Sequence, residues 1–134
     1  MSSIAKKVSQ EHPDRMVLEE FETYLMTRQY SSNIRKTYIS YMVTTWRYFS
    51  NLPEPKRVID LTREDLVCFI DLAMSSDTSL VPPFRNKPWS FLTMHAFATS
   101  WGQFFAFCIK QGYITENPAE DMHKYLNDNY GSEQ

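Results

Sequence analysis

The sequence predicts an all-α fold, a bundle of four main helices with a short fifth helix near the C-terminal end. Apolar residues recur with the spacing of an α-helix through four long segments. The 7 prolines fall between these segments, as expected because proline clashes with the backbone of a helix interior. The chain has 3 glycines, too few for an all-β fold with many tight turns. With 134 residues, 43% of them hydrophobic and 22% charged, it has the size and composition of one soluble domain.

The first predicted helix covers residues 14–28 and the second covers residues 32–50. In the first, glutamates occupy the face opposite the apolar residues, which are Val17, Phe21, Tyr24 and Leu25. In the second, the hydroxyl of Ser31 or Ser32 can cap the first amide groups. The inward stripe of this second helix is expected to comprise Ile34, Tyr38, Tyr41, Met42, Thr45 and Phe49.

The third predicted helix begins after Thr62, which is a good N-cap residue, and Asp65 completes a weaker form of the capping box. Its buried face is expected to comprise Leu66, Phe69, Ile70 and Ala73. The fourth predicted helix covers residues 90–111 and is apolar on nearly all sides, which is typical of a helix at the centre of a core. Gly112 is the natural residue to end it.

The remaining segments define the ends of the domain. A short last helix is expected to begin at Asn117, with Pro118 in its first position and Glu120 at its third. Residues 76–89 show no period and are predicted to form a long loop, of a length that often serves a function. The predicted organisation is a flexible N-terminus at 1–13, one helical domain at 14–126, and a polar tail or the start of a linker at 127–134.

Motifs of known catalytic or cofactor chemistry are missing from the sequence. It has no glycine-rich phosphate loop, no HExxH or GxSxG motif and no EF-hand loop, so we expect no cofactor. Its 2 cysteines and 3 histidines lack the spacing of metal ligands, and both Cys68 and Cys108 are expected to be buried free thiols. Free thiols and the lack of an apolar signal segment favour a cytoplasmic location. No apolar run approaches the ~20 residues that cross a bilayer.

Positive charge is concentrated in one part of the chain. Six basic residues and one acid, Glu54, lie between Arg28 and Arg57, which gives a local charge of +5 in a chain whose net charge is −2. Hydroxyls, amides and arginines near a helix start are groups that hold phosphate oxygens. The candidates for this role are Arg28, Ser32, Asn33, Arg35, Lys36 and Arg47. The alternative is a solvated helix face with ordinary solubility charges.

The predicted loop adds Arg85 and Lys87, followed by Trp89. A basic loop beside an aromatic ring could touch a nucleic-acid backbone or a base. Alternatively, the loop is pinned to the domain by burial of Trp89. His95 in the fourth helix is interpreted first as a histidine at the core edge or on a contact surface rather than as a catalytic base.

Three segments together resemble a known family. They are FETYLMTRQYSSNIRKTYISYMVTTWRYFSN, then DLTREDLVCFID, and finally TMHAFATSWGQFFAFCIKQGYITENPAEDM. In this order they resemble the N-terminal region of tyrosine recombinases and phage integrases, over about residues 17–122. In the last segment the family pattern is a paired aromatic, a glycine and an isoleucine before Asn-Pro, here Phe104-Phe105, Gly112, Ile114 and Asn117-Pro118.

The resemblance implies a SAM-like core-binding domain that contacts double-stranded DNA and positions it for a separate catalytic domain in site-specific recombination. The family's catalytic residues belong to that second domain, so this chain alone is not expected to be an enzyme. Its expected partners are duplex DNA, a recombinase catalytic domain and other recombinase protomers. The residues that the resemblance adds to the DNA-binding candidates, in the fourth helix, are His95, Thr99 and Gln103.

A second function remains open at this point, a helical protein-interaction module on the same fold with little affinity for DNA. Many relatives carry arginines on the fourth helix roughly where this chain has Ala96, Gly102 and Gln103, and the sequence pI is about 5.9. Both features favour this alternative. An exposed aromatic patch around Phe84 and Trp89 would support it.

Overall fold

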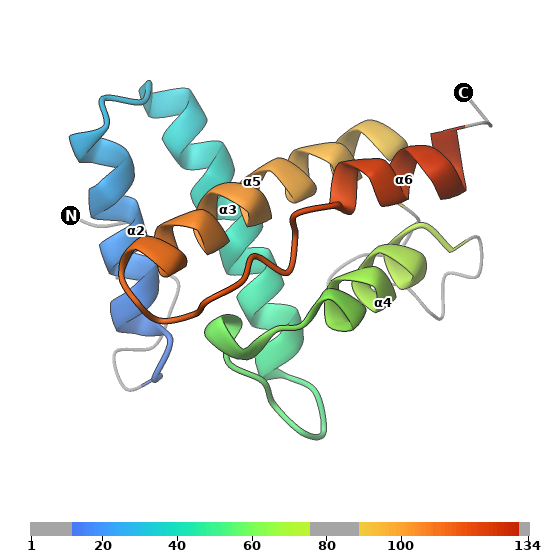
Figure 1. Cartoon of the computed structure of the whole chain (residues 1–134), viewed down its shortest axis with the longest axis horizontal. Helices are drawn as coiled ribbons and strands as arrows, with labels where there is room; N and C mark the ends of the chain where they lie inside the picture. The colour runs from blue at the N-terminus through green and yellow to red at the C-terminus, as the bar shows by residue number, and fades with distance from the viewer. Residues whose placement is uncertain (1–11, 76–88, 132–134) are drawn as a thin grey trace.

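The computed structural model describes residues 12–75 and 89–131, and in these residues it contains helices and no strand, which confirms the all-α prediction. Figure 1 shows how the helices are arranged. Their bounds are α2 (Arg15–Thr27), α3 (Ser32–Ser50), the short 3-10 helix η1 (Val58–Asp60), α4 (Arg63–Ala73), α5 (Phe91–Lys110) and α6 (Met122–Tyr130).

Helix α5 is the centre of the bundle, as its apolar sequence predicted. The helix crosses α3 and packs most extensively against α3 and α6, and α6 runs beside its N-terminal half (Figure 1). Its side chains Trp101, Phe104 and Phe105 are fully buried. Hydrophobic residues of α2, α3, α4 and α6 all join one core around it.

Local capping explains why the sequence predicts the starts of three helices well. The Ser31 hydroxyl accepts a hydrogen bond from the Ile34 amide at 3.2 Å. Thr62 and Asp65 form a complete capping box, in which each side chain accepts from the other's backbone amide. Ser90 accepts from the Thr93 amide at 3.1 Å. Each interaction joins residues three apart, so each is readable from local sequence.

Gly112 ends α5 as predicted. Its φ of 80° is in the left-handed region that glycine adopts without steric cost. The Gly112 amide donates to the Ile109 carbonyl and the Tyr113 amide donates to the Cys108 carbonyl, both at 3.0 Å. This pair of hydrogen bonds is a Schellman motif, which satisfies carbonyls that the helix end would otherwise leave unpaired.

Trp89 lies in the core rather than on the surface. Its side chain is 5% exposed and stacks on Phe97, with ring centroids 4.7 Å apart. Its amide donates to the carbonyl of Ala73, the last residue of α4, at 2.8 Å. Burial of Trp89 anchors the chain just before α5, as the second interpretation requires of this residue, whereas residues 76–88 lie outside the described residues.

The prediction for the last helix is wrong at both ends. The Asn117 side chain accepts from the Ala119 amide at 2.8 Å, as a capping residue does, but residues 118–121 form a turn and the helix begins only at Met122. The helix also continues to Tyr130, through residues expected to belong to a loose tail. The Tyr125 and Tyr130 hydroxyls both donate to the carboxylate of Asp71 in α4, at 2.8 and 2.7 Å, which fixes this segment.

Two further expectations about burial are wrong. Cys68 is exposed, whereas Cys108 is buried, and burial raises the pKa of the Cys108 thiol to about 12. Ile34 is 41% exposed because the first turn of α3 extends beyond the crossing with α5, and Ile39 and Val43 take part in the core instead. Of the N-terminal segment expected to be flexible, residues 1–11 lie outside the described residues.

Candidate nucleic-acid interface

Five of the predicted DNA-binding residues gather where α2 ends and α3 begins. Arg28 follows α2 directly, and the residues in the first turns of α3 are Ser32, Asn33, Arg35 and Lys36. The connection between the two helices is four residues long and includes Gln29 with a φ of 61°. This short link holds the two helix ends together, so residues close in sequence also form one surface.

The two arginines of this surface are held by neighbouring aromatic residues. The Arg28 guanidinium lies 5.7 Å from the ring centroid of Tyr24, a cation–π distance. The Arg35 guanidinium donates from Nη1 to the Tyr30 carbonyl at 3.2 Å and is half-buried. Arg35 therefore keeps most of its five donors for another acceptor while its position is fixed.

Lys110 joins the same surface, although its local sequence did not predict this. Its ammonium lies 5.4 Å from the Tyr24 ring centroid and 3.3 Å from the Tyr24 hydroxyl. Tyr24 therefore contacts the cationic groups of both Arg28 and Lys110. Lys110 is the last residue of α5 and 86 positions from Tyr24, so no local pattern could place it. We name these four cations, Arg28, Arg35, Lys36 and Lys110, the basic corner.

The basic corner differs electrostatically from the other cations of the domain. None of its four members, nor Arg47, forms an ion pair with a carboxylate in residues 12–75 and 89–131. The other described cations are neutralised in pairs, which are Arg15–Glu19, Lys56–Asp65, Arg57–Asp14, Arg63–Asp121 and Lys124–Asp128. The uncompensated positive charge of an acidic chain is therefore concentrated on a few side chains, which gives them a local attraction for anions.

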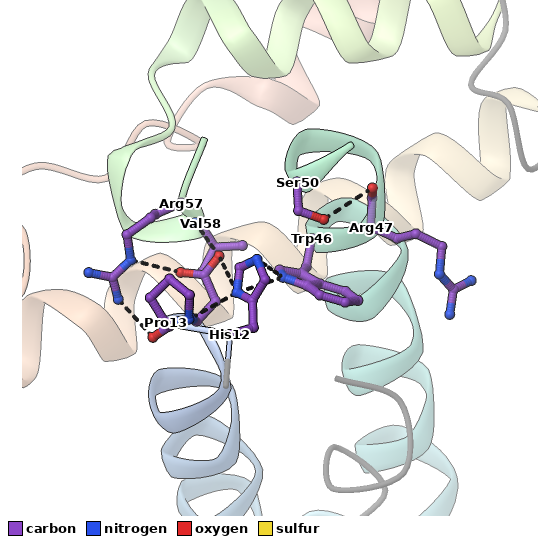
Figure 2. Close-up of polar contacts among 8 residues, drawn as sticks. His12, Pro13, Trp46, Arg47, Ser50, Arg57 and Val58 are labelled. Carbon is purple, nitrogen blue, oxygen red and sulfur yellow. Dashed lines mark hydrogen bonds and ion pairs between the residues drawn. The ribbon is translucent and has the colours of Figure 1, made fainter. Parts of the chain in front are cut away.

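Arg47 lies at the far end of α3. It is eleven residues from Lys36, which is about 16 Å along the helix axis. Figure 2 shows its side chain pointing away from the neighbouring cluster, in which His12 contacts Trp46 and Arg57 bonds to Pro13. Its guanidinium is free to bind an external group, but it forms a second cationic point rather than part of the basic corner.

Two of the three predicted residues of α5, His95 and Thr99, lie against α6. His95 contacts His123 and Asn127, and Thr99 contacts His123. Gln103 is half-buried further along the helix. Within the described part of the chain, no hydrogen bond joins these three residues to the basic corner. Arg85 and Lys87 lie outside the described residues.

Acidic residues limit the basic corner on one side. A groove of about 860 Å³ runs between α2 and the end of α5, and Tyr24 lines it together with Glu19 and Glu20. Tyr113 donates a hydrogen bond to the Glu20 carboxylate, and this bond raises the pKa of the Tyr113 hydroxyl. The glutamates disfavour a polyanion in the groove, so an anionic ligand is expected to stay at the corner.

Metal-binding clusters and membrane-spanning helices are both absent from the residues that the structure describes. Residues 12–75 and 89–131 contain no group of three or more His, Cys, Asp or Glu side chains placed to hold a metal ion. None of the helices that the structure describes combines the length and apolar character needed to cross a membrane.

Comparison of the chain with protein-family models, with curated proteins and with solved structures finds no match.

Proposed function

We propose that this chain is a DNA-binding module of the tyrosine recombinase type, which holds duplex DNA by its phosphate backbone. The observation that supports the proposal best is the basic corner, where four cations lack carboxylate partners while most other described cations are paired. Arginine and lysine contacts to phosphate supply most of the affinity of non-specific DNA binding. They position a protein on the duplex without reading its sequence.

The spacing of the cations suits an extended polyanion. The basic corner and Arg47 mark two ends of α3, about 16 Å apart along its axis. Successive phosphates of one DNA strand rise by about 3.4 Å, so that separation spans several of them. A single small anion would engage one end only, whereas a duplex can engage both. Cutting and rejoining of DNA belong, in this proposal, to a separate catalytic domain.

The alternative of a protein-interaction module has less support. The aromatic patch that would favour it required an exposed Trp89, and Trp89 is buried against Phe97. Phe84 lies outside the described residues. We therefore treat protein interaction as an outcome of the DNA-binding experiment rather than as a second proposal.

The test is fluorescence anisotropy of a labelled random duplex titrated with the protein at several salt concentrations. We expect the logarithm of the binding constant to fall linearly with the logarithm of salt concentration. The double variant Arg35→Ala plus Lys36→Ala removes up to two phosphate contacts, so it should bind more weakly and reduce that slope by about 1.8.

The matched control is the double variant Arg63→Ala plus Lys124→Ala. It removes the same charge from α4 and α6, where both cations are already paired with aspartates. Circular dichroism melts establish that both variants are folded. If the two variants lose the same affinity, binding depends on net charge and the basic corner is not the interface. No binding by the wild-type protein at 50 mM salt would overturn the proposal and favour the protein-interaction module.

A further inference from the structure

Two histidines from different helices form a directly bonded pair. His95 of α5 and His123 of α6 stack with ring centroids 4.9 Å apart and planes at 14°. Their Nδ1 atoms are 2.6 Å apart. The outer nitrogens also have partners, since His95 Nε2 lies 3.1 Å from Asn127 Oδ1 and His123 Nε2 lies 3.1 Å from Thr99 Oγ1.

The contact between the two Nδ1 atoms accommodates a single proton. In the neutral pair, one Nδ1 donates and the other accepts. When one proton is added, both Nε2 atoms become donors and the Nδ1 proton is still shared. His95 then donates to Asn127, His123 donates to the Thr99 oxygen, and the Thr99 hydroxyl remains free to donate to the His95 carbonyl at 3.1 Å. Every polar group of the cluster is satisfied in this singly charged state.

A second added proton cannot be accommodated in this geometry. It would place two N–H groups against each other across 2.6 Å and two positive charges on stacked rings. The charge repulsion and the lost hydrogen bond both act against the packing of α6 on α5. Burial, and then the neighbouring His95, lower the pKa of His123, which agrees with this reasoning.

The surroundings offer no carboxylate to stabilise a doubly charged pair. On α5, the neighbour of His95 is the apolar ring of Phe91, at 4.5 Å between centroids. On α6, Lys124 pairs with Asp128, and Asp121 at the N-cap of this helix pairs with Arg63 of α4. No described carboxylate forms an ion pair with either ring of the His95–His123 pair.

We propose that His95 and His123 act as one proton-sensitive junction, which binds a single shared proton and loosens the α5–α6 contact when the second proton binds. The direction of the pH dependence of this contact follows from the lowered pKa of His123. The unfolded chain binds more protons than the folded chain between the ordinary histidine pKa of about 6.5 and the lowered pKa of His123, so the junction weakens as the pH falls from the first value through the second. Buried Met122 and Leu126 and the tyrosine bonds to Asp71 keep α6 attached to the rest of the domain.

The test is an NMR titration of the whole chain from pH 8 to pH 5, which follows the three histidine rings and the backbone amides of α6. His12 lies outside the pair and serves as the internal reference. We expect His95 and His123 to titrate in two coupled steps, with the α6 amides shifting in the second step and their hydrogen-exchange protection falling by up to tenfold per pH unit. Independent, identical curves for the two rings, or α6 amides that do not respond, would overturn the proposal.

The variant His95→Asn provides a second measurement. It removes one charge and keeps an amide group close to the former Nδ1 position. We expect the pKa of His123 to rise toward its ordinary value and its curve to become that of a single site. An unchanged His123 curve in this variant contradicts the shared proton. Should the variant not fold, the wild-type titration decides the question alone.

Discussion

The indole nitrogen of Trp101 donates a hydrogen bond to the hydroxyl oxygen of Thr45 at 2.8 Å, and both side chains are fully buried. The bond joins α5 to α3 where the two helices cross. The Thr45 hydroxyl in turn donates a hydrogen bond to the Tyr41 carbonyl, also at 2.8 Å. Because both polar groups are satisfied, this contact fixes the crossing without the cost of an unpaired buried donor.

Replacement of Thr45 by valine is expected to destabilise the domain. Valine has the same shape but leaves the Trp101 N–H without an acceptor in the core, which costs about 1–3 kcal/mol. Urea unfolding measures the change. Thr45→Ser is the control, since it keeps the hydroxyl and loses only a methyl group. A valine variant at least as stable as the serine variant would show that the hydrogen bond does not stabilise the crossing.

Asp14 is a buried carboxylate that joins the start of α2 to η1. It is 0% exposed and accepts from Arg57 Nε at 3.1 Å and from the Val58 amide at 3.2 Å. Asp14→Asn removes the charge that strengthens both bonds, so we expect a loss of about 1–3 kcal/mol in the free energy of unfolding. The exposed Asp60→Asn is the matched control and should change stability by less than about 0.5 kcal/mol. Equal effects of the two substitutions would contradict this role.

Lys110→Ala tests the part of the basic corner that comes from α5. The variant should weaken binding to a duplex and reduce the salt slope by about 0.9, because it removes one phosphate contact. Lys124→Ala also removes one lysine, from an ion pair on α6, and should leave the slope unchanged. If anisotropy gives the same slope for Lys110→Ala and the wild type, Lys110 is not part of the interface. The Arg35 and Lys36 variants still test the remainder of the corner in that case.

The Arg63–Asp121 bridge between α4 and α6 is expected to contribute to stability only above acid pH. Hydrogen bonds from Arg63, at 2.9–3.0 Å, lower the pKa of the Asp121 carboxyl. The folded chain thus holds the ionised form more strongly than the unfolded chain. The contribution is complete above the ordinary aspartate pKa of about 3.9 and is lost as the pH falls through the lowered value.

This prediction is checked with thermal unfolding curves of the wild type and Asp121→Asn between pH 7 and pH 2. The bridge is partly exposed, so the difference at pH 7 should be small, about 0.2–1 kcal/mol, and should vanish at the acid end. A difference that persists unchanged at pH 2 would mean that Asp121 acts through packing rather than through its charge.

The sequence by itself determined the four helices α2, α3, α4 and α5. Their boundaries depend on Ser31, Thr62, Ser90 and Gly112, whose capping interactions join residues at most five apart. Interactions of such short range leave a signature in local sequence. The apolar character of α5 likewise predicted its central position, because a helix that is hydrophobic on nearly all sides has no face for solvent.

Only the tertiary structure decided the extent of α6 and the environment of the functional side chains. Asp71 holds Tyr125 and Tyr130 across 54 and 59 positions, Lys110 reaches Tyr24 across 86, and His95 meets His123 across 28. Such contacts depend on how helices pack, and no local spacing encodes that packing. Sequence periodicity fixes which face of a helix is apolar, whereas the approach of two helices decides which polar side chains become partners.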